Sequence, residues 1–408
     1  MESLFQDKTE LGSLVSPQSN QHEPIYSWFS FKHGFSKDLV EKIIQEFDLK
    51  TGDWVLDPFC GSGTTLLTCK NHRIRAMGFD ILPFSVYLTN IKSQNYDEIS
   101  LVEQLRKFKK IAQNKINTPA LPDIPLIAKA FNPAIWRELL LLKSQIDSIE
   151  DTKIRNFFNL GFLSILEPVS DTTKAGGFLR ITKKEISKKD IRNLFLKKIV
   201  SMISDVILIN NNGKIENISC SAKIGDARKI STNRSFNAII TSPPYPNRHD
   251  YTRIYSLEMI FDFVKSNDEL KNIRYDTLRS HVEAKKRFNV KNYSKPEILN
   301  DLLKKIERNG TNNPQVVEML EGYFEDMAMA ISEMKNHLKN NGKIALVVSN
   351  VRFAGINIPV DEILGEIGKN YGLKIKSIWI LRYRGNSSQQ MKKYKRSPSR
   401  ESIVIWEK

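Results

Sequence analysis

The sequence predicts an α/β fold with a mostly parallel sheet, and two observations carry this prediction. Between residues 53 and 93, short apolar segments alternate with segments of helical periodicity, as they do in βαβ units. Strand patterns return at 220–227 and 236–241, and each ends in polar or turn-forming residues. In an open α/β sheet the loops at the carboxyl ends of the strands carry the functional groups, so we expect a site at these ends.

The composition describes a chain of 408 residues with an excess of positive charge. Lys and Arg number 62 against 46 Asp and Glu, and the formal net charge of +16 favours a partner that carries phosphates. The three cysteines and six histidines have no spacing typical of a metal site, so we expect no metal and no disulfide. The sequence has no signal-peptide pattern and no apolar run near the roughly 18 residues that span a bilayer. We therefore expect a cytoplasmic protein without a membrane segment.

The elements can be assigned from the N-terminus onward. Residues 1–24, rich in Gln, Ser and Asn, have no periodicity and predict a flexible N-terminal arm. Ser36 suits the N-cap of a helix that places Leu39, Ile43 and Phe47 on one face. The next elements are a strand at 53–57, a helix to about residue 71, a strand at 74–80 and a helix at about 84–93.

Two long segments interrupt the alternation. Residues 96–215 have almost entirely helical patterns, broken by a Pro-rich link, TPALPDIP, and by a Gly-Gly turn in TTKAGGFLRITKK, and predict a helical insertion. Residues 265–312 are basic and poorly periodic. A long helix then ends at Gly342, in the position of a C′ glycine, and leads into a buried strand. The last two segments, 373–384 and 401–408, predict two strands that pair as a long hairpin at the sheet edge.

Two features of the first βα unit predict a nucleoside ligand. The strand that ends at Asp57 enters a turn, PFCGSGTT, in which Gly61 and Gly63 let the backbone approach a ligand closely. The turn has neither the lysine of a P-loop nor the third glycine of the dinucleotide fingerprint, which argues against a pyrophosphate. Asp80 ends the next strand, about 20 residues later, where a carboxylate can bind both hydroxyls of a ribose; a helix N-cap is the alternative role. S-adenosylmethionine fits these features, with Asp57 available to its amino group.

The segment DPFCGSGTT, followed downstream by TSPPY, resembles the paired signature motifs of the DNA amino-methyltransferases, which methylate an exocyclic nitrogen of cytosine or adenine. The resemblance implies a Rossmann-like class I methyltransferase fold with a seven-stranded, mostly parallel sheet and an antiparallel edge strand. It also implies S-adenosylmethionine as cofactor, double-stranded DNA as partner and a target base flipped out of the duplex. The implied catalytic domain comprises residues 25–95, 216–264 and 313–408.

The family's cofactor-binding residues can be carried over position by position. The turn and the following strand contribute Asp57, Pro58, Phe59, Gly61, Gly63, Thr64, Thr65 and Asp80. Asp226, in IGDAR, matches the position that contacts the adenine of the cofactor, with a strand-end cap as the alternative. Phe31 and His33 loosely match the N-terminal motif that closes over the methionine end of the cofactor.

The SPPY motif, residues 242–245, has a chemical rationale of its own. An exocyclic amine is a poor nucleophile because its lone pair is delocalised into the ring, and acceptors aimed at its hydrogens favour a pyramidal nitrogen that can attack. The family pattern supplies two acceptors, the Ser242 side chain and the Pro243 carbonyl, while Pro243 and Pro244 stiffen the loop. Tyr245 can stack on a base extruded from the duplex. A plain turn is the alternative for this motif.

The first residue of the motif bears on the target base. In the family, Asp or Asn is usual here for adenine, whereas Ser is typical of enzymes that make N4-methylcytosine. A serine hydroxyl can accept from the amine and donate to cytosine N3, which an ionised aspartate cannot do. N4-cytosine is therefore favoured, with N6-adenine as the alternative. Methylation of cytosine C5 is set aside, because its cysteine nucleophile usually follows a proline and none of Cys60, Cys69 and Cys220 does so.

Basic and polar residues near the motif are candidates for DNA contact. Interleaved basic and aromatic residues in 274–295 and 385–399 suit phosphate contact and stacking, with a solvated charged face as the alternative. We expect the insertions 96–215 and 265–312 to form the surface that reads the DNA sequence. The candidate contact residues are Asn247, Arg248, Tyr251, Lys285, Lys286, Arg287, Lys392 and Lys393.

The expected context is a restriction-modification system in which a cognate endonuclease acts separately. Two other functions stay open. The tRNA guanine-N2 methyltransferases use a similar motif pair, but they usually bring an N-terminal RNA-binding domain, and only about 25 residues precede the catalytic fold here. A nucleic-acid binder that has kept the fold without activity is disfavoured by the presence of the glycines, Asp80 and SPPY together.

Overall fold

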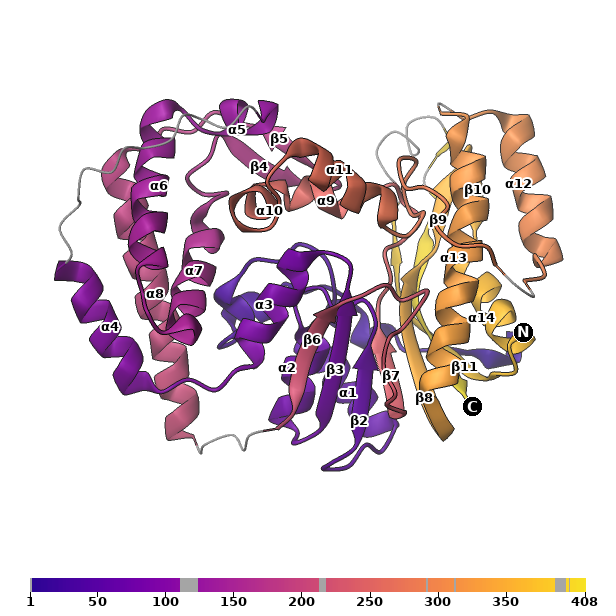
Figure 1. The fold of residues 1–408 in the computed structure, drawn as a ribbon. Coiled ribbons are helices and arrows are strands. Elements are labelled where there is room, and N and C mark those ends of the chain that lie inside the picture. The colour runs from indigo at the N-terminus through magenta and orange to yellow at the C-terminus, as the bar shows by residue number, and fades with distance from the viewer. Residues whose placement is uncertain are drawn as a thin grey trace.

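An eight-stranded sheet runs through the middle of the molecule, with helices on both faces (Figure 1). The computed structural model describes residues 2–110, 124–212, 218–290, 293–311, 313–385, 394–395 and 397–408. The strand order is β1-β11-β12-β8-β7-β2-β3-β6. The strands are β1 (Phe5–Asp7), β2 (Trp54–Asp57), β3 (Arg75–Asp80), β6 (Cys220–Ile224), β7 (Phe236–Thr241), β8 (Leu338–Ser349), β11 (Lys374–Arg384) and β12 (Ser399–Glu407).

The sheet has the order of a doubly wound fold. Strands β6, β3, β2, β7 and β8 are parallel neighbours, and β2 and β7 meet where the strand order reverses. The predicted Rossmann-like class I methyltransferase fold is confirmed, as is the pairing of β11 with β12 in an antiparallel hairpin. Two details of the prediction are wrong. The sheet has eight strands, and the antiparallel strand β12 lies between β8 and β11 instead of at the edge.

The N-terminal segment explains the eighth strand. β1 pairs in parallel with β11, with Phe5 opposite Ile378, so it covers backbone groups that an edge strand would leave unpaired. Gly12 packs so closely on β11 that a Cβ there would lie 2.6 Å from the Leu381 carbonyl oxygen. The expectation of a flexible arm is therefore wrong for residues 2–24. The 3-10 helices of this segment and of the residues just after it are η1 (Glu2–Leu4), η2 (Thr9–Val15), η3 (Ser19–His22) and η4 (Tyr26–Trp28).

Alternating side chains of the strands bury both faces of the sheet. Val55 of β2 packs with α1 (Lys37–Glu46) and α2 (Thr64–Asn71), whereas the next residue, Leu56, packs with α13 (Gln315–His337) and α14 (Val360–Asn370). Ser36 caps α1 as predicted, because its Oγ accepts from the Leu39 N–H at 3.3 Å. Helix α13 ends at His337, before Gly342, because the chain is already extended at Leu338, which pairs with β7.

The first insertion packs beside the sheet edge that β6 forms (Figure 1). Its helices share one hydrophobic core with α3 and with the helices between residues 251 and 276, which follow the SPPY motif. The Gly-Gly turn expected to break the helical patterns is confirmed at Gly176 and Gly177, but the strands on either side of it were not predicted: β4 and β5 form an antiparallel hairpin at 172–181. The helices of this region are α3 (Pro83–Ser93), α4 (Glu98–Lys110), α5 (Pro125–Ala130), α6 (Pro133–Asp147), α7 (Thr152–Ile165) and α8 (Lys188–Asn211), and the hairpin strands are β4 (Thr172–Ala175) and β5 (Phe178–Ile181).

The second insertion runs from the carboxyl ends of the central strands to α13 (Figure 1). Helices α9 to α11 lie above the carboxyl ends of the central strands in Figure 1, and α12 packs on the outer side of α13. No helix in the described parts of the chain combines the length and the apolar character that a membrane crossing requires. The remaining elements are α9 (Tyr251–Ile254), α10 (Ser256–Asp262), α11 (Asn267–Asp276), α12 (Glu297–Asn309), β9 (Val351–Phe353) and β10 (Ile356–Ile358).

Candidate active site

The carboxyl ends of β2, β3, β6 and β7 open into one cavity of about 420 Å³, within the usual size range of small-molecule sites. Segments that are far apart in the sequence meet there. They include the glycine-rich turn at residues 58–65, here called the cofactor turn, and the SPPY loop at residues 242–245. The predicted site residues that line the cavity are Phe31, His33, Asp57, Pro58, Phe59, Gly61, Thr64, Thr65, Asp80, Asp226, Ser242, Pro243, Pro244, Tyr245, Asn247 and Tyr251.

Of the residues predicted to bind the cofactor, Gly63 alone does not line the cavity. It precedes α2 with a left-handed φ of 78°, which an L side chain adopts at a cost. A Cβ there would lie 2.9 Å from the Thr89 side chain, so the turn can pack this closely on α3 only with glycine. Gly63 therefore shapes the turn, while Gly61 faces the cavity and donates its N–H to Asp80 Oδ2 at 2.9 Å.

Asp57 and Asp80 are two carboxylates at the ends of neighbouring strands. Asp57 accepts from Thr241 Oγ1 at 2.6 Å and from the Phe59 N–H at 3.2 Å. Asp80 accepts from the Gly61 N–H and, through Oδ1, from the Leu82 N–H at 2.9 Å. The alternative role of Asp80 as a helix N-cap is wrong, because Leu82 holds the N-cap position of α3 and no side chain among the described residues caps that helix. Burial raises the pKa of each carboxyl to about 6. Both groups are therefore ionised at neutral pH and can accept hydrogen bonds from hydroxyl or ammonium groups.

Three buried polar atoms in the cavity wall have no hydrogen-bond partner among the described residues. These are His33 Nδ1, Ser85 Oγ and His249 Nδ1. Burial, with His249 nearby, lowers the pKa of His33 to about 4, so this imidazole is neutral at physiological pH. Buried polar atoms in folded proteins are nearly always paired, so these atoms indicate a polar ligand. Together with Asp57 and Asp80, they fit S-adenosylmethionine, which brings hydroxyl, ammonium and carboxylate groups.

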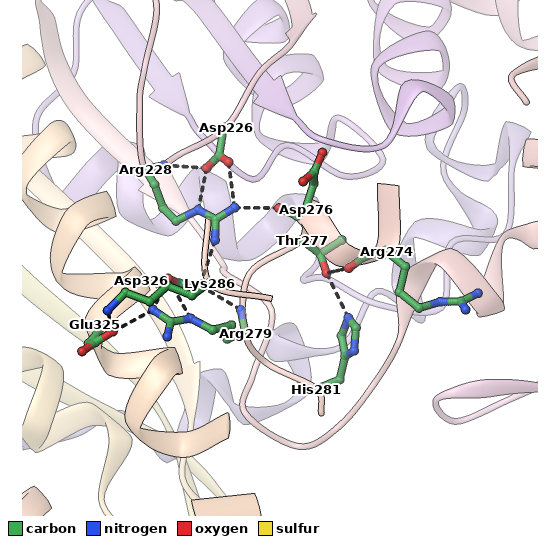
Figure 2. A network of polar contacts seen from close by, with 10 residues as sticks. All are labelled: Asp226, Arg228, Arg274, Asp276, Thr277, Arg279, His281, Lys286, Glu325 and Asp326. Carbon is green, nitrogen blue, oxygen red and sulfur yellow. Dashed lines mark hydrogen bonds and ion pairs between the residues drawn. The ribbon is translucent and has the colours of Figure 1, made fainter. Parts of the chain in front are cut away.

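Asp226 lines the cavity but is also held by a neighbour. Its Oδ1 accepts from Arg228 Nε at 2.9 Å and its Oδ2 from Arg228 Nη2 at 2.8 Å. Figure 2 shows how Arg228 continues to Asp326 of α13 at 2.9 Å and to the Asp276 carbonyl at 2.6 Å. Asp326 in turn binds Arg279. This network, Asp226–Arg228–Asp326–Arg279, ties the loop after β6 to the second insertion.

The SPPY loop starts directly at the end of β7. The Ser242 hydroxyl donates to the Tyr245 hydroxyl oxygen at 3.3 Å, and both residues line the cavity. Burial raises the pKa of the Tyr245 phenol well above its usual range, so this group stays protonated. Thr241 binds Asp57 across neighbouring strands, which joins this loop to the cofactor turn.

Aromatic side chains form the part of the cavity wall that lies next to Gly61, where a Cβ would lie 3.4 Å from the Phe31 ring. The Phe31 ring stacks on Tyr255 with centroids 4.5 Å apart and an interplanar angle of 12°. His33 meets Tyr251 edge to face at 4.9 Å and His249 at 5.5 Å. The loosely matched N-terminal motif therefore lies in the cavity wall, in contact with residues that follow SPPY.

The candidate DNA-contact residues divide into two groups. Asn247 and Tyr251 line the cavity, whereas Arg248 is exposed and its N–H donates to the Ser280 carbonyl at 3.0 Å. The cations of the second insertion are exposed but have partners. Lys285 lies 4.1 Å from the Tyr275 ring centroid, Lys286 lies 3.5 Å from Glu325, and Arg287 lies 2.5 Å from Asp276. Lys392 and Lys393 fall outside the described residues.

Several cavity residues were not predicted from the sequence. Arg382 and Arg384 at the end of β11 both pair with the buried Glu401 of β12, the latter at 2.9 Å. Their signal was the RYR sequence before a basic loop, but only the pairing of β11 with β12 brings them to Glu401 and into the cavity that SPPY lines. The segment 274–295 was expected to contact DNA, and part of it lines the cavity. The further lining residues include Gly176, His249, Thr277, Ser280, His281, Arg382, Arg384 and Glu401.

This chain is similar to known DNA methylases and type II methyltransferases. A family model described as DNA methylase matches residues 8–90. The chain is 34% identical to the type II methyltransferase M.BsoBI of Geobacillus stearothermophilus, over 97% of this chain and 88% of that protein. It is 31% identical to M.AvaI of Nostoc sp., over 100% and 92% of the two chains. M.MvaI of Kocuria varians, also a type II methyltransferase, is 24% identical over 78% of this chain and 74% of its own.

Proposed function

The chain belongs to the DNA amino-methyltransferase family, whose cofactor is S-adenosylmethionine, and from this premise we propose that it methylates the exocyclic N4 amine of a cytosine flipped out of duplex DNA. The observation that carries the proposal is Ser242 at the first position of SPPY, in the wall of the cavity that the cofactor turn also lines. The family membership itself makes the chain a site-specific DNA methyltransferase. The choice of N4-cytosine over N6-adenine is the proposal.

Ser242 and its neighbours prepare the amine. The Ser242 hydroxyl accepts from one amine hydrogen and donates to cytosine N3, and the Pro243 carbonyl accepts from the other hydrogen, which favours a pyramidal nitrogen. The hydrogen bond from Ser242 to Tyr245, at 3.3 Å, is weak enough to exchange for the base. The Tyr245 ring stacks on the flipped base and offsets part of its unstacking. Pro244 keeps this loop rigid.

The cavity residues from the ends of β2, β3 and β6 would hold the cofactor, which supplies an electrophilic methyl group when bound. Asp80 accepts from the ribose hydroxyls and Asp57 from the amino group, both as ionised carboxylates. Phe31 and His33 close over the methionine end, and Asp226 approaches the adenine while its carboxylate keeps Arg228 in place. The turn residues Pro58, Phe59, Gly61, Thr64 and Thr65 supply the remaining wall.

The DNA lies over the cavity mouth, which parts of both insertions reach. Gly176 of the first insertion and Thr277, Ser280 and His281 of the second reach the cavity, which supports the proposal that 96–215 and 265–312 read the target sequence. Arg384, whose side chain is 59% exposed, is available to a phosphate near the flipped nucleotide. We place the enzyme in a restriction-modification system, with a separate endonuclease that the modified DNA resists.

The experiment that tests the proposal is methylation of duplex DNA with labelled S-adenosylmethionine, followed by mass spectrometry of the nucleosides. N4-methylcytosine at one sequence context is the expected product. N6-methyladenine would replace the proposed target while keeping the reaction class, and labelled N2-methylguanine in tRNA but not in DNA would overturn the proposal. Asn247→Ala and Ser242→Ala should be run together, because only the second removes a group assigned to the reacting amine.

A further inference from the structure

The β4–β5 hairpin of the first insertion brings its tip to the catalytic loop. Gly176 lines the cavity, and Gly177 packs against His249, four residues after Tyr245. A Cβ at position 177 would lie 2.8 Å from His249 Cδ2 and 3.2 Å from His249 Cα. The close approach therefore depends on glycine, and it places the first residue of β5 beside the mouth of the cavity.

A buried ion pair holds the hairpin in this position. Lys174 of β4 lies 2.6 Å from Glu258 of α10, and the two side chains are 2% and 0% exposed. The Lys174 ammonium also lies 4.8 Å from the Phe29 ring centroid and 5.0 Å from that of Tyr255, the residue that stacks on Phe31. The hairpin is thus anchored to the same aromatic wall that borders the cavity.

Phe178 presents an exposed aromatic ring at this anchored tip. It is 52% exposed, and by strand alternation it shares a face with the exposed Arg180, whereas Leu179 packs into the insertion core. Ile181, at the other end of β5, is 49% exposed but belongs to the opposite face. An aromatic ring and a cation on one face beside the cavity are the groups that insert between bases and bind phosphate.

We propose that Phe178 enters the base stack at the position that the flipped target base vacates, while Arg180 binds an adjacent phosphate. The inference rests on the proposed extrusion of the target base. Removing a base from the duplex leaves neighbouring bases unstacked, which opposes the extruded state. An apolar side chain that fills the gap restores stacking contacts and therefore shifts the equilibrium toward the extruded base. The hairpin thereby couples sequence reading by the insertion to delivery of the base.

The test compares Phe178→Ala with wild-type enzyme on two duplexes, one fully paired and one with the target base opposite an abasic site. Loss of a stacking aromatic should lower kcat/KM about tenfold on the paired duplex. On the abasic duplex, where extrusion is already easy, the loss should shrink to about twofold. Phe178→Leu should recover part of the activity, since an aliphatic wedge also fills the gap. Ile181→Ala is the matched control and should leave both rates unchanged.

A fluorescent cytosine analogue that still pairs with guanine, placed at the target position, reports extrusion directly. Wild-type enzyme should raise its fluorescence, and Phe178→Ala should raise it less at saturating protein. Equal losses on both duplexes, or no loss on either, would overturn the role of Phe178. If wild-type enzyme methylates the paired duplex without any fluorescence change, the proposed base extrusion fails, and this outcome is distinct from a failure of the wedge alone.

Discussion

Replacing Asp326 by asparagine should destabilise the protein through the network in Figure 2. Asp326 is fully buried and accepts from Arg228 Nη1 at 2.9 Å and from Arg279 at its N–H, Nε and Nη2, at 2.9, 3.1 and 2.7 Å. Asn keeps the size but turns one acceptor into an NH₂ donor that faces a guanidinium. Arg228 and Arg279 would both lose the carboxylate charge of Asp326. Arg228 would keep its ion pair with Asp226, and Arg279 would keep its contact with Glu325.

Breaking a buried ion pair by removing one partner typically costs about 3–5 kcal/mol. With about 2.1 cal/mol/K of unfolding entropy per residue over 408 residues, a loss of about 4 kcal/mol lowers Tm by about 5 °C. Differential scanning calorimetry measures this shift. Glu325→Gln is the matched control, because Glu325 binds the same Arg279 at 3.0 Å but is 22% exposed. Its loss should cost at most about 1 kcal/mol. Equal Tm shifts for the two variants would refute the argument that burial decides the cost.

Three further predictions concern the cavity. Ser242→Ala should lower kcat about 100-fold, the usual cost of one lost group that stabilises a transition state, and leave the calorimetric Kd for S-adenosylmethionine unchanged; equal losses in both would contradict its role. Because the pKa of Asp57 and of Asp80 is about 6, the Kd should rise as pH falls below about 6. In the free protein the same raised pKa values favour the protonated carboxyls, since the folded state binds more protons than the unfolded state, so their contribution to stability is lost as pH rises from about 4 through 6. As pH rises from 5 to 7, titration calorimetry should therefore show a higher affinity for S-adenosylmethionine, whereas melting curves of the free protein should show a lower Tm. A pH-independent Kd would refute the assignment. Gly63→Ala should lower the free energy of unfolding by about 1–3 kcal/mol, because alanine would have to adopt a left-handed backbone and its Cβ would meet Thr89. The variant should also bind the cofactor more weakly. An unchanged Tm would contradict the packing described above.

The parts of the site that were predictable share one physical origin. Asp57 and Asp80 each end an apolar strand, and Ser242 directly follows one. Parallel strands place such ends at one edge of a sheet, so the local pattern was enough to bring these residues together. Glu401 could not be found in this way, because its place beside SPPY depends on β12 lying inside the sheet. The same holds for Gly177, whose contact with His249 joins segments more than 70 residues apart in the sequence.

Other errors arose where tertiary contacts override local preference. The polar composition of residues 1–24 predicts no structure, yet the free edge of β11 supplies backbone partners that β1 takes. Gly342 has the position of a helix C-cap in the sequence, but pairing with β7 extends the chain from Leu338 onward. The Gly-Gly turn within the helical patterns could be predicted, but the strands beside it could not, because β4 and β5 have only four residues each.

The hydrogen bond between Thr241 and Asp57 spans adjacent strands of the central sheet. Neighbouring strands are held about 4.8 Å apart by their backbone hydrogen bonds, a spacing that side-chain changes elsewhere hardly alter. The residues assigned to the methyl donor and those assigned to the methyl acceptor therefore follow two adjacent strands, β2 and β7, whose separation the sheet fixes. Loops and insertions can diverge to recognise new DNA sequences without changing that separation, which offers a reason why one catalytic core can serve many specificities.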